Sequence, residues 1–181
     1  MEAARLAGRH ALLLRNHAGR RNMTQWSARS GIPLHPRLAD ALETAIRTVN
    51  VLVSHARARR VRGLVVMDRH LYCQLGLRNV RGLPRGRFLP WLLRHLPSPD
   101  LVIHFDIAPG QALERILLRG TDTETLEELT ALSQGYRALP EYPGFLRLDA
   151  GGTEAEVLAA LIDAIDGSRS NGGPEPVSAK Q

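Results

Sequence analysis

The chain contains four short apolar runs, separated by segments in which apolar residues recur with helical periodicity. The runs are HALLLR (10–15), GLVVM (63–67), DLVIHFD (100–106) and GFLRLD (144–149). Runs of this length, bounded by polar residues or glycine, are typical of buried strands. Strands that alternate with helices form parallel sheets joined by right-handed crossovers. The pattern therefore predicts an α/β domain whose sheet is covered by helices on both faces.

The longest helical segment follows His35-Pro36 and extends to about Arg59. Proline suits the first turn of a helix, because its missing N–H would have no partner there. We predict that the apolar positions of this helix form its core face: Leu38, Leu42, Ile46, Val49 and Val53. Polar positions line another face: Asp40, Glu43, Arg47, Asn50 and Ser54.

Further helix signals lie in the second half of the chain. Helices are predicted over 88–95 and over 109–119, where Pro109 opens the second helix and Gly120 closes it. Two later helix starts carry the capping-box pattern: Thr121 with Glu124, and Thr153 with Glu156. The last 15 residues, GSRSNGGPEPVSAKQ, are polar and rich in Gly, Ser and Pro. We therefore expect one α/β domain over residues 1–166 and a disordered tail over 167–181.

Composition is ordinary for a soluble globular protein. The chain has 181 residues, of which 44% are apolar and 23% are charged. No apolar stretch approaches the ~18 residues of a membrane span, and residues 1–14 lack the pattern of a secretory signal. The single cysteine, Cys73, allows no internal disulfide. We expect a cytoplasmic protein that does not contact membranes.

The basic side chains are almost all arginine. Of 24 Lys and Arg residues only Lys180 is lysine, and the formal net charge is +6. Forked guanidinium groups suit phosphate and carboxylate, although a coding bias toward arginine explains the same composition. The arginines are scattered, and aromatic residues make up only 4% of the chain. This argues against a nucleic-acid-binding module.

Three titratable residues, Asp68, Arg69 and His70, directly follow the apolar run 63–67. In parallel α/β sheets, ligands bind beyond the carboxyl ends of the strands. Unpaired charges buried elsewhere in a sheet would cost several kcal/mol. The position therefore predicts a ligand site. Pairing of Asp68 with Arg69, or a cap on the next helix, is the structural alternative.

Several stretches together resemble the thymidylate kinase family of P-loop nucleoside monophosphate kinases. VVMDRH (65–70) is similar to the family's Asp-Arg motif, and PDLVIHFDIAPGQALERILLRG (99–120) to its fourth strand and following helix. Gly135-Tyr136 matches the Gly-Tyr after the lid, and Asp149-Ala150 matches the Asp-Ala after the last strand. Arg47 stands about 21 residues before Asp68, where the family carries an arginine on a long helix. The resemblance extends from about residue 4 to residue 166.

The resemblance implies a three-layer α/β/α fold with a parallel sheet of the P-loop NTPase kinase type. It also implies transfer of the γ-phosphate of ATP to a nucleoside monophosphate, with dTMP as the first candidate and Mg²⁺ as cofactor. Family members often pair through the long helix, so a homodimer through residues 36–59 is implied as well.

Roles for individual residues follow from the same resemblance. Asp68 would lie near the Mg²⁺ and the attacking phosphate, as the one metal-holding residue. The catalytic set would be Asp68, Arg69, Arg115 and Arg119. The acceptor nucleotide would be bound by Arg47, Asn50, Arg69 and His70, with His70 packing or stacking rather than acting as a base. The base of ATP would border Ala150 and Gly151.

Some of these arginines also have a purely structural interpretation. Arg115 and Arg119 lie four residues apart, which fits a solvated helix face. Arg47 shares a stripe with Asp40 and Glu43 and would there form helix ion pairs.

Several stretches depart from the family pattern, among them residues 15–19, which stand where the family has Arg-Glu-Pro-Gly. Leu77 and Arg78 stand where the family has Tyr and Gln, so the acceptor nucleotide is left open. The lid stretch 120–128 contains no arginine.

The phosphate-loop motif Gly-x-x-x-x-Gly-Lys-Ser/Thr does not occur in the 181 residues. On the resemblance, the first, central strand and the phosphate loop would lie before Met1. The strands at 63–67 and 100–106 must then pair directly, leave a gap, or accept a strand from elsewhere.

Two accounts fit the missing motif: a fragment of a working kinase, or a relative that binds nucleotide or a protein partner without chemistry. In both, this chain by itself is expected to be inactive, because the amides and lysine that cradle the transferred phosphate are missing. A deoxynucleoside kinase is the alternative within the enzyme class.

Overall fold

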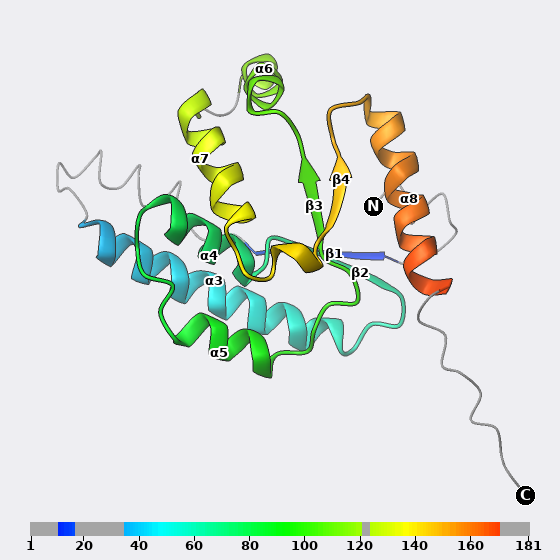
Figure 1. The fold of residues 1–181 in the computed structure, drawn as a ribbon. Coiled ribbons are helices and arrows are strands. Elements are labelled where there is room, and N and C mark those ends of the chain that lie inside the picture. The colour runs from blue at the N-terminus through cyan, green and yellow to red at the C-terminus, as the bar shows by residue number, and fades with distance from the viewer. Residues whose placement is uncertain (1–10, 17–34, 121–123, 171–181) are drawn as a thin grey trace, which may run out of the picture.

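The computed structural model describes residues 11–16, 35–120 and 124–170 (Figure 1). In chain order the elements are β1 (Ala11–Arg15), α3 (Pro36–Ala58), β2 (Leu64–Asp68), α4 (Leu71–Val80), α5 (Phe88–His95), β3 (Ile103–Asp106), α6 (Pro109–Arg119), α7 (Leu126–Arg137), the 3-10 turn η1 (Tyr142–Gly144), β4 (Leu146–Asp149) and α8 (Glu154–Ser170). The predicted helices over 88–95 and 109–119 are confirmed, and each predicted strand is present within a few residues of its expected bounds. Helix α4 was not predicted.

Two helix ends differ from the sequence expectation. Thr121, the first predicted cap of α7, lies outside the described residues. The helix is capped instead by Thr125, whose hydroxyl accepts from the Glu128 N–H while the Glu128 carboxylate accepts from the Thr125 N–H. At the other end of the domain α8 continues to Ser170, so the first residues of the expected tail are helical, and 171–181 lie outside the described part.

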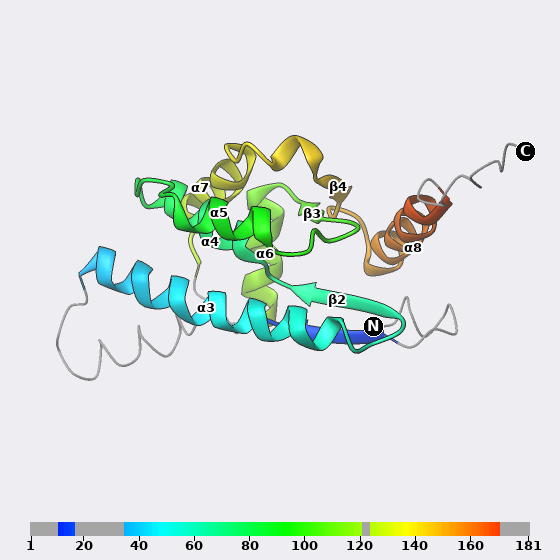
Figure 2. The same cartoon turned by 90° about the horizontal axis from the view of Figure 1, so that it is seen from below.

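The strands are parallel, as predicted, but they form two pairs. β1 pairs with β2 from Ala11↔Leu64 to Arg15↔Asp68, and β3 pairs with β4 from Ile103↔Leu146 to Asp106↔Asp149. Within the described residues β2 and β3 share no ladder, so the two strands do not pair directly. Figure 2 shows β1 and β2 beside α3, whereas Figure 1 shows β3 and β4 beside α7 and α8. The α/β class is confirmed, with two small pairs in place of one continuous sheet.

The predicted core face of α3 is wrong. The apolar side chains on that face are between 39% (Ile46) and 58% (Val49) exposed, whereas Asp40, Glu43 and Arg47 are each only 2% exposed. The core lies on the other side of the helix, where Val51 joins Leu71, Leu75, Leu89, Leu92 and Leu139. The polar face can point inward because α4 and the residue that caps its C-terminus supply partners for it: Gln74, Arg78 and Arg81.

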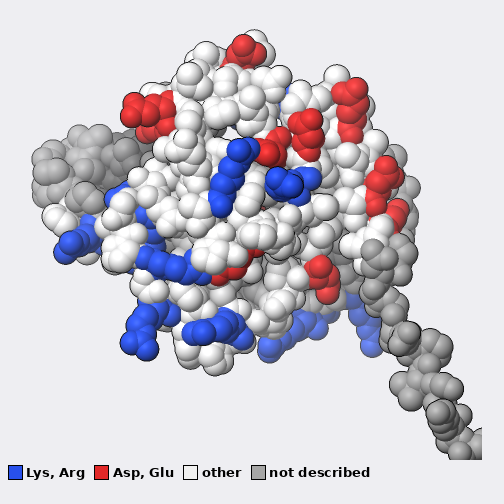
Figure 3. Space-filling model, viewed as in Figure 1, with Lys and Arg blue, Asp and Glu red and all other residues white. Residues whose placement is uncertain are grey.

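Charges are unevenly spread over the face of the molecule drawn in Figure 3. Acidic side chains gather toward the end with α6, α7 and α8, and basic side chains toward the end with α3 and α5. β3 and β4 point toward the acidic end, and both strands end in aspartate, Asp106 and Asp149.

Candidate functional site

The end of β2 is fixed by a short polar chain. Arg69, the residue after the strand, has φ = 71°, a left-handed conformation that costs a non-glycine residue roughly 1–2 kcal/mol. Its carbonyl oxygen accepts from Asn16 Nδ2 at 2.7 Å, and Asn16 Oδ1 accepts from Ser54 Oγ at 2.7 Å. Backbone held in this region is frequent at binding sites. Asn16 was not predicted as a site residue, because its role depends on the pairing of β1 with β2.

Arg47 is a buried cation next to this turn. Its Nε donates to Gln74 Oε1 at 3.2 Å, and its Nη1 is buried without any hydrogen-bond partner. Burial lowers the pKa of Arg47, and the nearby Arg69 charge contributes in the same direction. The predicted ion pairs of Arg47 with Asp40 and Glu43 do not form, because these carboxylates bind Arg78 and Arg81.

Tyr136 and Cys73 complete the group, which we call the Arg47 cluster: Arg47, Arg69, Cys73 and Tyr136. Arg47 binds Gln74, the residue after Cys73, and it interacts electrostatically with Arg69, Cys73 and Tyr136. Burial raises the pKa of Tyr136, and its hydrogen bond with Cys73 adds to this, so the phenol is neutral.

Tyr136 reaches the cluster because α4 and α7 pack at close range. A Cβ on Gly135 would lie 2.7 Å from the Gly76 carbonyl oxygen, and a Cβ on Gly76 would lie 3.4 Å from the Tyr136 ring. In the Gly-Tyr pair, Gly135 therefore allows the two helices to approach closely, and this approach brings the Tyr136 phenol to the cluster. Asn50 lies one turn after Arg47 on α3 and is half-buried.

The Arg47 cluster is suited to an anion. It holds two guanidinium groups, and among the described residues neither forms an ion pair with a carboxylate. A buried cation with an orphaned N–H costs free energy until an acceptor arrives. Forked N–H donors from two arginines match the oxygens of a phosphate group.

His70 lies at the N-terminus of α4, beside the cluster. Its Nε2 lies 3.2 Å from His55 Nε2, and its ring packs at a tilt against the Tyr72 ring, with ring centroids 5.2 Å apart. Burial, with a smaller contribution from His55, lowers the pKa of His70 to about 4. The ring is therefore neutral at pH 7, which agrees with a packing or stacking role.

The structure places Arg115 away from this cluster. Its Nη1 donates to the Ala150 carbonyl at 2.6 Å, and its Nη2 donates to the carbonyls of Gly151 and Gly152 at 3.0 and 2.7 Å. The arginine thereby holds the loop that was expected to border the base of ATP. Arg119, one turn further along α6, is exposed.

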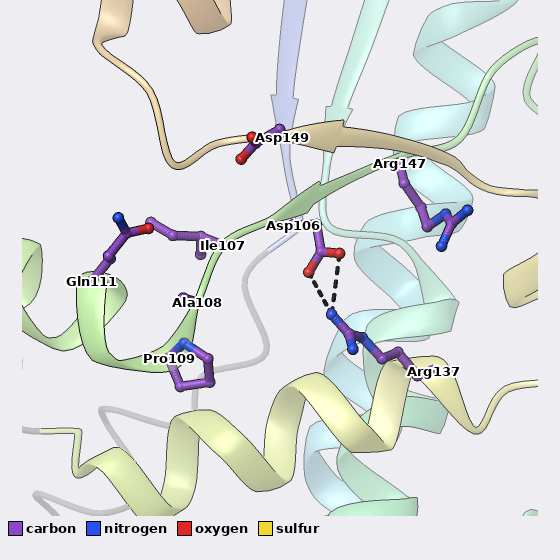
Figure 4. A pocket seen from close by; sticks show the side chains of 8 residues that line it. All are labelled: Asp106, Ile107, Ala108, Pro109, Gln111, Arg137, Arg147 and Asp149. Carbon is purple, nitrogen blue, oxygen red and sulfur yellow. Dashed lines mark hydrogen bonds and ion pairs between the residues drawn. The ribbon is translucent and has the colours of Figure 1, made fainter.

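An open cleft of about 580 Å³ lies at the carboxyl ends of β3 and β4 (Figure 4). Asp106 accepts from Arg137 Nη2 with both oxygens, at 2.9 and 3.1 Å, and Asp149 accepts from the Gly151 N–H at 2.8 Å. Both carboxylates are thus already hydrogen-bonded. Both aspartates belong to stretches that the sequence analysis matched, 99–120 and Asp149-Ala150, but neither was named as a site residue. Two strands that end in aspartate are the signal that would have located the whole cleft.

The described residues offer little for a metal ion by themselves. They contain no group of three or more His, Cys, Asp and Glu side chains placed to hold one. Asp68 is exposed at the end of β2. Mg²⁺ in phosphoryl-transfer sites is commonly held by one or two carboxylates together with substrate phosphates. The exposed carboxylate of Asp68 fits the role of the protein ligand in such a site. No helix in the described ranges is long and apolar enough to cross a membrane.

Comparisons with known proteins point in one direction. No family model matches the chain. A stretch of 64 residues is 41% identical to a protein named probable thymidylate kinase from Pyrococcus horikoshii, and covers 34% of this chain but only 29% of that protein. A solved thymidylate kinase from Candida albicans matches 88% of this chain and 91% of its own, with a TM-score of 0.54 and 16% identity. At that identity the second match speaks for the fold alone. The chain is thymidylate kinase-like in fold, and in sequence over the matched stretch.

Proposed function

We propose that the Arg47 cluster binds the phosphate of a nucleoside monophosphate, with dTMP as the first candidate. The observation that carries the proposal is the buried Nη1 of Arg47, which lacks a hydrogen-bond partner beside a second arginine. An acceptor phosphate would satisfy this N–H and balance both charges. Asn50 and His70 stand at the edge of the cluster, where they would contact the nucleoside.

We further propose that the fold serves phosphoryl transfer from ATP, with Mg²⁺ held jointly by Asp68 and nucleotide phosphates. The residues expected to bind the phosphate donor, ATP, support this proposal only in part. Asp68 is available, whereas the sequence contains no phosphate-loop motif, and Arg115 is engaged with backbone carbonyls. We therefore propose that these 181 residues bind the acceptor and, by themselves, do not transfer phosphate. The single cysteine supports a place in the cytoplasm.

A second copy of the chain is the partner that we propose. The exposed apolar positions of α3 form a stripe, which we call the α3 stripe: Leu38, Leu42, Ile46, Val49, Leu52 and Val53. The stripe is about 22 Å long at the usual helical rise. Contiguous exposed apolar surface of this kind is typical of protein–protein interfaces.

Calorimetric titration of the chain with dTMP and with thymidine tests the acceptor proposal. The ligands differ only in the phosphate, so we expect dTMP to bind more tightly. Arg47→Met should remove most of this preference, a loss of about 2 kcal/mol or roughly thirtyfold. Arg94→Gln, at an exposed arginine on α5, is the control and should leave it unchanged.

The same titration separates the alternatives. Equal affinity for thymidine and dTMP in the wild type would contradict the proposal and favour a deoxynucleoside kinase-like site. Binding of neither ligand would favour an interaction protein.

A further inference from the structure

Gln74 stands between a buried cation and a buried anion. Its Oε1 accepts from Arg47 Nε at 3.2 Å, and its Nε2 donates to Asp40 Oδ1 at 3.0 Å. Gln74 is fully buried, and Arg47 and Asp40 are each 2% exposed. The amide thus connects the two opposite charges without letting them form an ion pair.

Asp40 is neutralised from its other side. Arg78 Nε donates to Asp40 Oδ2 at 3.0 Å, and Arg81 Nη1 lies 3.6 Å from Oδ1. Glu43 binds Arg81 Nη2 at 2.9 Å. The two inward carboxylates of α3 are therefore matched by two cations, Arg78 of α4 and Arg81 at its C-terminal cap. Arg78 and Arg81 remain about a fifth exposed, whereas Arg47 is 2% exposed, and among the described residues no carboxylate pairs with it.

We propose that Gln74 is a positioning residue for Arg47: its neutral amide holds the guanidinium in place and leaves the positive charge unpaired for an incoming phosphate. A carboxylate at this position would bind the guanidinium through charge-assisted hydrogen bonds and compete with the ligand. An apolar side chain would leave Nε without an acceptor and the guanidinium without a fixed orientation. The inference deepens the proposed function and rests on it for the identity of the ligand.

Three variants of the full chain separate these roles. Gln74→Glu keeps the shape and adds a carboxylate, and Gln74→Met keeps the length and removes both hydrogen bonds. Gln134→Glu, at an exposed position on α7, is the matched control for the added charge. Affinity for dTMP relative to thymidine is measured at pH 8, so that the introduced carboxylate is ionised.

We expect Gln74→Glu to lower the preference for dTMP at least tenfold, because the ligand must break a new ion pair. Gln74→Met should lower it several-fold, because orientation is lost while the charge remains. Gln134→Glu should retain the wild-type ratio. A ratio for Gln74→Glu within twofold of the wild type would overturn the proposal.

The NMR signal of the Arg47 Nε–H group reads the same contact without a nucleotide. In the wild type it should exchange slowly with solvent and shift when inorganic phosphate is added. In Gln74→Met it should exchange rapidly, and in Gln74→Glu the phosphate response should be absent. An Arg47 signal that is unaffected by Gln74→Met overturns the positioning role even if dTMP binds. If the signal depends on Gln74 and responds to phosphate while dTMP shows no preference, only the nucleotide assignment fails.

Discussion

His55 and His70 face each other through their Nε2 atoms, 3.2 Å apart, and so tie the C-terminal part of α3 to the turn between β2 and α4. Their rings meet edge to face, with centroids 5.5 Å apart. A single proton lies between two neutral imidazoles in such a pair, since one nitrogen donates and the other accepts. His70 Nδ1 is buried without a partner, so a charged His70 ring would have an unsatisfied N–H.

This pair predicts a loss of stability in mild acid. Burial, and then His55, lowers the pKa of His70 from 6.5 to about 4, so the unfolded chain binds the proton more readily than the folded chain. The free energy of unfolding should be highest above pH 6.5 and fall as the pH is lowered toward about 4, by up to about 3 kcal/mol from this residue. Urea unfolding of the wild type between pH 4 and 8 measures the effect.

His70→Phe is the informative variant, because it keeps the aromatic contact with Tyr72 and removes the titration. Its unfolding free energy should change less between pH 6.5 and 4 than that of the wild type. The same change at the exposed His95 should leave the contribution of His70 in place. Equal slopes for the wild type and His70→Phe would show that the pair does not couple folding to protons.

Gly135→Ala should separate α4 from α7. The new Cβ would lie 2.7 Å from the Gly76 carbonyl oxygen and 2.8 Å from Val80 Cγ2. Overpacking of this kind costs about 1–3 kcal/mol, and it should also displace Tyr136 from the Arg47 cluster. Thermal unfolding measures the loss. Gly110→Ala in α6, where no atom lies within 4 Å of the new Cβ, should leave the melting temperature unchanged or raise it slightly.

Arg115→Gln should loosen the loop between β4 and α8. Three hydrogen bonds to carbonyl oxygens are lost, from a guanidinium that is largely exposed, so we expect about 1–2 kcal/mol. Hydrogen exchange at the loop amides should accelerate together with the fall in stability. Arg119→Gln, on the same helix, should affect neither quantity. If Arg115→Gln leaves hydrogen exchange at the loop amides unchanged, Arg115 does not hold the loop and is again a candidate for contact with phosphate.

A charge on the α3 stripe should change the state of association. Val49, within the α3 stripe, is 58% exposed. Val49→Arg would place a cation inside the apolar contact between the two copies. Light scattering coupled to size-exclusion chromatography should show a dimer for the wild type and a monomer for the variant. Leu118→Arg, at an 88% exposed position on α6, is the control and should remain dimeric. A monomeric wild type would contradict the proposal that the α3 stripe binds a second copy of the chain.

The sequence by itself determined the local elements. Pro109 and Gly120 bound α6 at the residues that their backbone preferences dictate, and the apolar runs located the four strands. The Asp-Arg pair at the end of β2, the arginine about 21 residues earlier and the Gly-Tyr pair indicated the candidate site through their resemblance to the thymidylate kinase motifs.

Tertiary structure decided which way these elements face. The apolar side of α3 is exposed and its polar side is buried, because Gln74, Arg78 and Arg81 come from another helix and are distant in the sequence. Amphipathic periodicity shows that a helix has two faces, but the choice between them depends on what packs there. The same holds for Asn16 at the turn after β2, for Arg115 on its loop, and for the separation of the strands into two pairs. Each of these depends on partners that only the folded chain brings together.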